Sequence, residues 1–281
     1  MNKVLFVNKP KGITSFDLCY KLRKVFKTKA IGHTGTLDPN ASGVMIILLN
    51  RCCKLNQFLV GDDKEYIAKV KLGFRTNTLD IDGEVIEERS CTMPSKDNLL
   101  AVLKSFVGKQ KQLPPMTSAI KVNGKKLIDY QRQNQKVEVK PRDIEIYALE
   151  LLSLADDEFI FKAHVSSGTY IRVLADDILN SLGIIGTLTD LTRISVGGVR
   201  IDDCDDLPSV LNNQFHEHEP YDLLASRYLN IDVNDDFSIK CGKPQIFDCE
   251  ADEVFVSKGR EALAIYRKGS DGKYHSVRGL F

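Results

Sequence analysis

The chain has 281 residues, of which 43% are hydrophobic and 27% are charged, as is ordinary for a globular protein with one large and one small domain. It contains no run of eighteen apolar residues and no apolar signal segment near its start, so neither a membrane span nor secretion is predicted, and a cytoplasmic location is expected. Residues 1–150 carry 26 Lys and Arg against 16 Asp and Glu, whereas residues 151–281 carry 13 against 22. The positive charge of the first half is explained equally well by a polyanionic partner and by an ordinary solvated surface.

The seven cysteines are scattered, odd in number and never in CxxC spacing. This pattern favours free thiols in a reducing compartment over a disulfide framework. No His, Cys, Asp or Glu residues have the spacing of metal ligands, and no cofactor motif is present. The sequence therefore predicts neither a metal site nor a bound cofactor.

The first sixty residues predict a strand, a turn, a helix and a second strand. Residues 3–7 are apolar and β-prone, and Pro10-Lys11-Gly12 is typical of a turn. Thr14 or Ser15 is expected to cap a helix, because apolar residues recur behind them at helical spacing. The glycine-rich loop 32–43 then leads into an apolar strand over residues 44–49.

Two later segments alternate between apolar and polar residues. Residues 66–72 and 159–165 both have this period of two, which predicts strands with one buried face. Residues 174–182 carry an apolar stripe at helical spacing, with Thr169 as the expected cap. Strands and helices do not alternate regularly, so the sequence predicts an α+β fold in which helices pack on a mixed sheet.

A domain boundary is expected near residue 225. Beyond it, short β-prone segments at 238–240, 253–256 and 262–266 are separated by glycines, which predicts a small β-rich domain. A unit of this size is near the lower limit for independent stability, so it should dock on the main domain.

The loop 32–43 is the most unusual segment of the chain. Three glycines and Pro39 impose a defined irregular backbone, and the proline holds Asp38 away from helical geometry. Such loops often carry functional side chains. By spacing alone, an ordinary Asp-Pro turn is the preferred interpretation of the segment.

The segment 32–43 resembles the signature loop of the TruB-type tRNA pseudouridine synthases. Other segments resemble further motifs of this family in the family's order, namely residues 8–15, 64–68 with 72–73 and 78–83, 114–124, 168–175, and 188–193. The resemblance implies a largely antiparallel mixed sheet flanked by helices and loops in a catalytic domain of residues 1–225. Residues 226–281 resemble a degenerate PUA-like RNA-binding domain, although the acidic second half of the chain, residues 151–281, argues against strong RNA contacts there. The resemblance also implies that the protein is a monomer.

The resemblance also implies an activity. Enzymes of this family isomerise uridine 55 in the TΨC loop of tRNA to pseudouridine without a cofactor, so the expected partner is the TΨC stem-loop of tRNA. The target nucleotide must be flipped out, its glycosidic bond broken, and the uracil reattached through carbon. Asp38 matches the catalytic carboxylate. Whether Asp38 attacks the sugar, attacks the base or removes a sugar proton is left open.

Four further residues match family positions near this carboxylate. Arg172 is expected beside Asp38, where a cation lowers a carboxylate pKa by about one to three units. Tyr66 is expected to stack on the uracil and to take part in proton transfer, and Leu191 to line the base pocket. His33 is expected to fill the space that the flipped base leaves. Without the resemblance, each of these residues has a plainer interpretation as a core, loop or helix-surface residue.

The remaining expected substrate contacts are Thr36 and Tyr170 at the pocket, and Lys9 and Lys11 at phosphates. The third motif departs from the family at Thr117 and Ile128, where aromatic side chains are usual, and this departure is expected to affect RNA contacts or local packing.

Other functions stay open at this stage. The first is a non-catalytic tRNA-binding or tRNA-folding protein, which would have no chemical reason to retain Asp38, Tyr66 and Arg172 together. The second is a pseudouridine synthase for another RNA. A metal hydrolase would need a ligand cluster that the sequence lacks.

Overall fold

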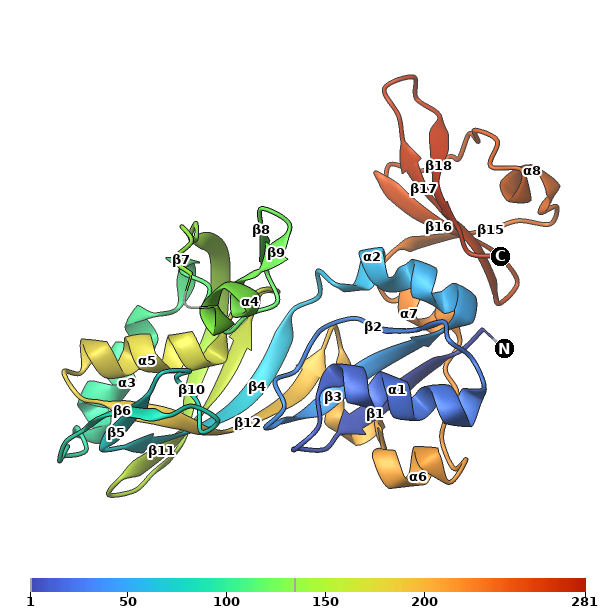
Figure 1. Ribbon diagram of the computed structural model, residues 1–281. Helices are drawn as coiled ribbons and strands as arrows, with labels where there is room; N and C mark the ends of the chain where they lie inside the picture. The colour runs from blue at the N-terminus through green and yellow to red at the C-terminus, as the bar shows by residue number, and fades with distance from the viewer. Residues whose placement is uncertain (1, 134) are drawn as a thin grey trace.

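The computed structural model describes residues 2–133 and 135–281, and its largest element is a ten-stranded mixed sheet (Figure 1). Most neighbouring pairs are antiparallel, whereas β1 runs parallel to β14 and β12 runs parallel to β3. In spatial order the strands are β14 (Asp205–Asp206), β1 (Val4–Lys9), β3 (Ala41–Leu49), β12 (Gly186–Val196), β4 (Lys64–Leu72), β11 (Glu158–Val165), β10 (Arg142–Leu154) and β7 (Gly108–Gln112), with β2 (Ile31–His33) on β3 and β13 (Val199–Arg200) on β12.

Helices and short hairpins surround this sheet. The helices are α1 (Ser15–Phe26), α2 (Asn56–Leu59), α3 (Lys96–Ser105), α4 (Leu127–Arg132), α5 (Ile171–Ser181), α6 (Leu207–Leu211), α7 (Pro220–Ala225) and α8 (Phe237–Lys240), with 3₁₀ turns η1 (Asn50–Leu55) and η2 (Ile201–Asp203). The hairpins are β5 (Phe74–Thr76) with β6 (Val85–Glu88), and β8 (Lys121–Val122) with β9 (Lys125–Lys126). Of the helices in the described residues, none has the length and apolar character that a membrane crossing requires.

The two faces of the sheet support separate cores. On β3, Met45 and Ile47 belong to the buried cluster that includes residues of α1, α3, α5 and α6, whereas Val44 and Ile46 belong to the cluster that includes residues of η1, α2 and α7. Burial on both faces explains why residues 44–49 are apolar without alternation. On β4, only alternate residues from Tyr66 to Leu72 are buried, as their period of two predicts.

A second sheet of four strands is formed by the C-terminal residues. It consists of β15 (Leu229–Asp232), β16 (Glu253–Lys258), β17 (Glu261–Lys268) and β18 (Tyr274–Gly279). Phe255 and Ile265 of this sheet belong to the same buried cluster as Val4 and Leu55. The small sheet therefore docks on the large one through apolar contacts, as expected for a unit of this size (Figure 1).

The α+β prediction is confirmed, while two local predictions are wrong. Residues 238–240 lie in α8 and not in a strand, because Asp235 accepts a hydrogen bond from the Phe237 amide and Asp236 pairs with Lys240 one turn later. Thr169 does not cap α5, because its hydroxyl donates to the Ser166 carbonyl instead. By contrast, Thr14 caps α1 in a full capping box.

Gly43 should be the glycine most sensitive to substitution in the sheet. Its φ is +114°, and a Cβ at this position would lie 2.1 Å from the Arg193 carbonyl oxygen on β12. Gly43→Ala should cost about 3 kcal/mol or more, since backbone strain and overpacking each contribute about 1–3 kcal/mol. Gly12→Ala is the matched control, because Gly12 also has a positive φ but nothing lies within 4 Å of its Cβ position. Urea unfolding checks both, and equal losses in the two variants would contradict the steric explanation.

Candidate active site

One cavity of about 440 Å³ collects most of the residues that the sequence singled out. Its walls come from the loop after β2, the start of β4, the segment before β8, the turn before α5, and β12. Asp38, Tyr66 and Arg172 line it together although they lie far apart in the sequence. The fold therefore assembles the predicted catalytic set in a single pocket.

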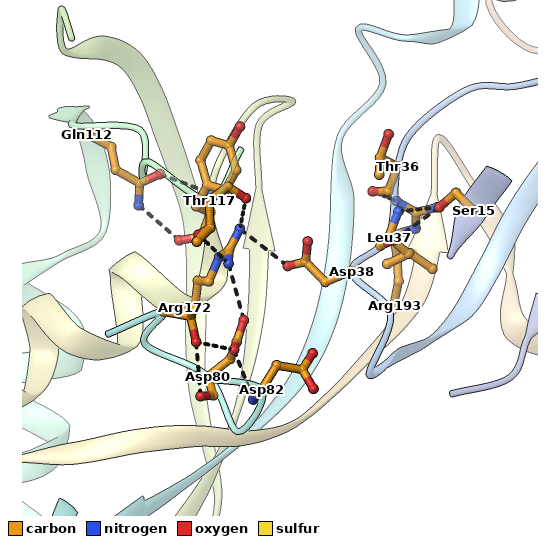
Figure 2. Close-up of polar contacts among 12 residues, drawn as sticks. Ser15, Thr36, Leu37, Asp38, Asp80, Asp82, Gln112, Thr117, Arg172 and Arg193 are labelled. Atoms are coloured by element: carbon orange, nitrogen blue, oxygen red, sulfur yellow. Dashed lines mark hydrogen bonds and ion pairs between the residues drawn. The ribbon is translucent and has the colours of Figure 1, made fainter. Parts of the chain in front are cut away.

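The Asp38 carboxylate faces the Arg172 guanidinium across 3.7 Å (Figure 2). Arg172 is only 5% exposed at the first turn of α5, so it is not a helix-surface arginine. Its Nη1 donates to Asp80 Oδ2 at 3.2 Å and to Thr117 Oγ1 at 2.8 Å, and its Nη2 donates to the Thr117 carbonyl at 3.2 Å. These contacts fix the plane of the guanidinium while one edge stays directed at Asp38.

Burial in the pocket raises the pKa of Asp38 above its ordinary value, and the Asp80 carboxylate adds to this rise. Arg172 opposes the rise, as its charge requires, but does not outweigh it. Arg172 thus has the expected sign of effect, but the overall shift in the pKa of Asp38 is upward, because burial disfavours the charged carboxylate more than one guanidinium favours it.

The loop that carries Asp38 is held from one side by Lys9. This lysine is fully buried, and its Nζ donates to the carbonyls of Pro10, Ile13 and Pro39 at 2.8–3.1 Å. All three ammonium protons are used, and burial lowers the pKa of Lys9 to about 8. The predicted phosphate contact of Lys9 is contradicted, because its side chain points into the protein and ties the turn after β1 to the Asp38 loop.

Ser15 and Arg193 hold the same loop at other points (Figure 2). The Ser15 hydroxyl accepts from the Leu37 amide at 2.9 Å and donates to the Leu37 carbonyl at 3.1 Å. Arg193 of β12 donates to the carbonyls of Gly35 and Thr36 at 3.1 and 3.4 Å. A loop fixed at this many backbone positions presents its carboxylate in one orientation before substrate arrives.

The other expected pocket residues divide into two groups. Tyr66, Leu191, Thr36 and Tyr170 all line the cavity. Tyr66 is 7% exposed and belongs to the same buried core cluster as Ala68, so it lines the cavity from the core side.

His33 and Lys11 lie outside the set of described residues that line the cavity. His33 is half-buried in β2 opposite Ile47, and burial together with the charge of Arg193 lowers its pKa. Lys11 is exposed, and its Nζ lies 2.6 Å from Asp190 Oδ2. A phosphate would have to displace this carboxylate or share Lys11 with it.

Comparison with known proteins agrees with this geometry. The family model described as TruB family pseudouridylate synthase (N terminal domain) matches residues 23–171. The chain belongs to the TruB family of pseudouridylate synthases. It is 38% identical to a protein of Oceanobacillus iheyensis named tRNA pseudouridine synthase B, over 95% of this chain and 93% of that protein.

A second TruB-family relative, from Fusobacterium nucleatum subsp. nucleatum and of the same name, is 47% identical over 70% of this chain and 68% of its own length. Among solved structures, a chain of a Cbf5-Nop10-Gar1 complex superposes with a TM-score of 0.75 at 20% identity, covering 99% of this chain and 85% of that one. At this identity the likeness concerns the fold, and it extends across both sheets of the TruB-family chain described above.

Several residues around the TruB-family pocket carried no functional prediction from the sequence. Asp80 and Thr117 accept hydrogen bonds from Arg172. The side-chain amide of Gln112 accepts from the Tyr170 N–H at 2.7 Å and donates to the Tyr170 carbonyl at 3.1 Å. Asp80 lies in a motif of the family and Gln112 precedes another, but a motif does not state which side chain another one contacts. In the described part of the chain, no group of His, Cys, Asp or Glu residues is placed to hold a metal ion, and all seven cysteines are free.

Thr117 should be required for the full rate of this TruB-family enzyme, although the family usually has an aromatic residue there. Thr117→Val keeps the shape and removes the hydroxyl that accepts from Arg172 Nη1, so turnover should fall about tenfold, as for one lost charged hydrogen bond. Thr117→Ser retains the acceptor and should restore most of the rate. Single-turnover kinetics test both variants, and equal rates in the valine and serine forms would contradict a role of the hydroxyl in positioning Arg172.

Proposed function

We propose that this pseudouridylate synthase acts on tRNA in the cytoplasm, as a monomer, and converts uridine 55 of the TΨC loop to pseudouridine. The observation that carries the proposal is the cavity in which Asp38 faces a buried arginine beside Tyr66 and Leu191. Its volume is within the usual range for small-molecule sites, about 300–1,000 Å³, which suits a single extruded nucleotide. The names of the relatives from Oceanobacillus and Fusobacterium support tRNA as the substrate class.

The reaction is an isomerisation in which atoms and electrons balance without a redox partner. After the uridine is flipped into the cavity, its N1–C1′ bond breaks, the uracil turns, and a C5–C1′ bond forms. The hydrogen of C5 leaves as a proton, and N1 gains one. The Asp38 carboxylate attacks the sugar, attacks the base or removes a sugar proton, and all three routes require it to be ionised.

The surrounding side chains have distinct proposed roles. Arg172 orients the Asp38 carboxylate and favours its charged form, as the sign of its effect on the pKa requires. Tyr66 presents its ring to the uracil, and Leu191 forms an apolar wall. Thr36 and Tyr170 complete the pocket, and His33, kept neutral by its lowered pKa, fills the space that the flipped base vacates in the RNA.

We also propose a division of labour along the chain. Residues 1–225 carry the chemistry, and residues 226–281 form a PUA-like domain that contributes to RNA binding. The two parts are also joined by an ion pair ahead of β4, in which Arg227 lies 2.7 Å from Asp62. Residues 226–281 carry nine Lys and Arg against nine Asp and Glu, so they lack the net positive charge of residues 1–150, which argues for a small contact area with RNA there.

Tritium release tests the proposed function. A tRNA transcript labelled at C5 of uridine should lose tritium with the wild-type protein and chelator present, because C5 exchanges its hydrogen for the bond to C1′. A transcript with cytidine at position 55 should release none above background. Tight tRNA binding without release would indicate a binding protein, and release from both transcripts would indicate another target uridine.

A further inference from the structure

Two further buried cations line the cavity that contains Arg172. Lys64 begins β4 and is 7% exposed, and Arg193 lies on the neighbouring strand β12 and is 1% exposed. Both line the cavity that contains Asp38. They converge on Gly35, where an added Cβ would lie 3.5 Å from Arg193 Nη1 and 3.6 Å from Lys64 Cε. The glycine leaves open a space that any side chain would occupy.

Neither cation has a carboxylate partner among the ion pairs of residues 2–133 and 135–281. Arg193 donates to three main-chain carbonyls, those of Val44, Gly35 and Thr36. Lys64 donates to the Asp62 carbonyl and, at 3.4 Å, to the Ser167 hydroxyl. Buried charges are normally paired, so two adjacent unpaired cations are unfavourable until an anion joins them.

The unused donors can take such an anion. Arg193 has five N–H groups and Lys64 three, so donors remain on both after their contacts within the protein. Burial and the charge of Arg193 lower the pKa of Lys64 to about 8, although the Asp62 and Asp63 carboxylates, which are too far away to form ion pairs with Lys64, oppose this shift. The charge of Arg172 is already balanced, because Asp38 lies 3.7 Å from its Nη2 and Asp80 accepts from its Nη1. The cavity is therefore lined by one cation that is paired with carboxylates and by two cations that have no ion pair with a carboxylate.

We propose that Lys64 and Arg193 form a phosphate-binding end of the active-site cavity, which holds a phosphodiester next to the uridine that reacts. This inference rests on the proposed RNA substrate. In this proposal Lys64 and Arg193 make the phosphate contact that the sequence assigned to Lys9, because all three ammonium protons of Lys9 are donated to carbonyls. A phosphate held there would fix the flipped nucleotide by its backbone, whatever the base, while Tyr66 and Leu191 contact the base itself.

Affinity measurements with an unreactive protein test the proposal. In the Asp38→Asn background, Lys64→Gln should weaken binding of a TΨC stem-loop about tenfold and reduce the slope of log affinity against log salt by about one. Lys64→Arg should keep the affinity and the salt slope of the parent, because it retains the positive charge. Lys71→Gln on the same strand is the matched control, since Lys71 is exposed and pairs with Asp157, and it should bind as the parent does.

A second measurement changes the RNA and compares its binding to the parent and to Lys64→Gln. Each of the two phosphates that flank the target uridine is replaced in turn by an uncharged methylphosphonate, on a 2′-O-methyl nucleotide. One replacement should weaken binding to the parent about tenfold and have little further effect on Lys64→Gln. Equal weakening in both proteins, at both positions, would overturn the inference. If wild type releases tritium but Lys64→Gln binds like the parent, the phosphate site is wrong and the proposed function stands. If wild type releases none, the proposed function is wrong.

Discussion

Asp38→Asn should abolish turnover while leaving tRNA affinity within about twofold of wild type. The amide has the shape of the carboxylate but cannot act as a nucleophile or as a base toward the sugar, so the rate should fall at least about 10³-fold. Binding should persist, because the loop around residue 38 is held by Lys9, Ser15 and Arg193 and not by the carboxylate. Tritium release under single-turnover conditions measures the rate, and filter binding measures the affinity.

Asp82→Asn provides the matched control for this experiment. Asp82 is a nearby carboxylate, but it is exposed and pairs with Asn40 rather than with Arg172. Its amide variant should keep most of the activity. If Asp38→Asn retained measurable turnover, or if Asp82→Asn lost as much as Asp38→Asn, the assignment of Asp38 as the catalytic carboxylate would be wrong.

Arg172→Met should have the second largest effect, lowering the rate about 10²–10³-fold. Removing one preorganised electrostatic contact costs this much in comparable sites. The change should also destabilise the fold by about 3–5 kcal/mol, since the Asp80 carboxylate, 15% exposed, would remain without its cation. Arg172→Lys keeps the charge but cannot contact Asp80, Thr117 and Asp38 together, so it should recover stability better than rate.

The pH profile separates a role of Arg172 toward Asp38 from a purely structural role. The ionised Asp38 is the active form, so activity should fall as pH drops through the pKa of Asp38. Arg172 lowers that pKa, and its removal should therefore raise it and move the acid limb of kcat/KM to higher pH. A variant with a reduced rate but an unshifted acid limb would show that Arg172 only supports the fold.

Local structure followed from local sequence in most of the chain. Alternation on β4 and β11, the capping box of Thr14 and the apolar run of β3 were all predictable, because each depends on neighbours within a few residues. The failures at Thr169 and at residues 238–240 have the same origin. In both places a local hydrogen bond to a residue two or three positions earlier decided between two conformations that the pattern of residue types left nearly equal.

The sequence by itself determined the family and the α+β fold class and led to the prediction of Asp38 as the catalytic carboxylate, since these rest on ordered motifs and on residue patterns. Only the tertiary structure decided which side chains meet. Lys9 and Lys64 both lie in segments that resemble family motifs. The ammonium group of Lys9 donates all its protons to main-chain carbonyls, whereas Lys64 lines the cavity. Likewise, Thr117 and Asp80 reach Arg172 from distant segments. The physical reason is that the direction of a side chain and the charges around it depend on strand register and loop packing between residues remote in sequence, which no local pattern contains.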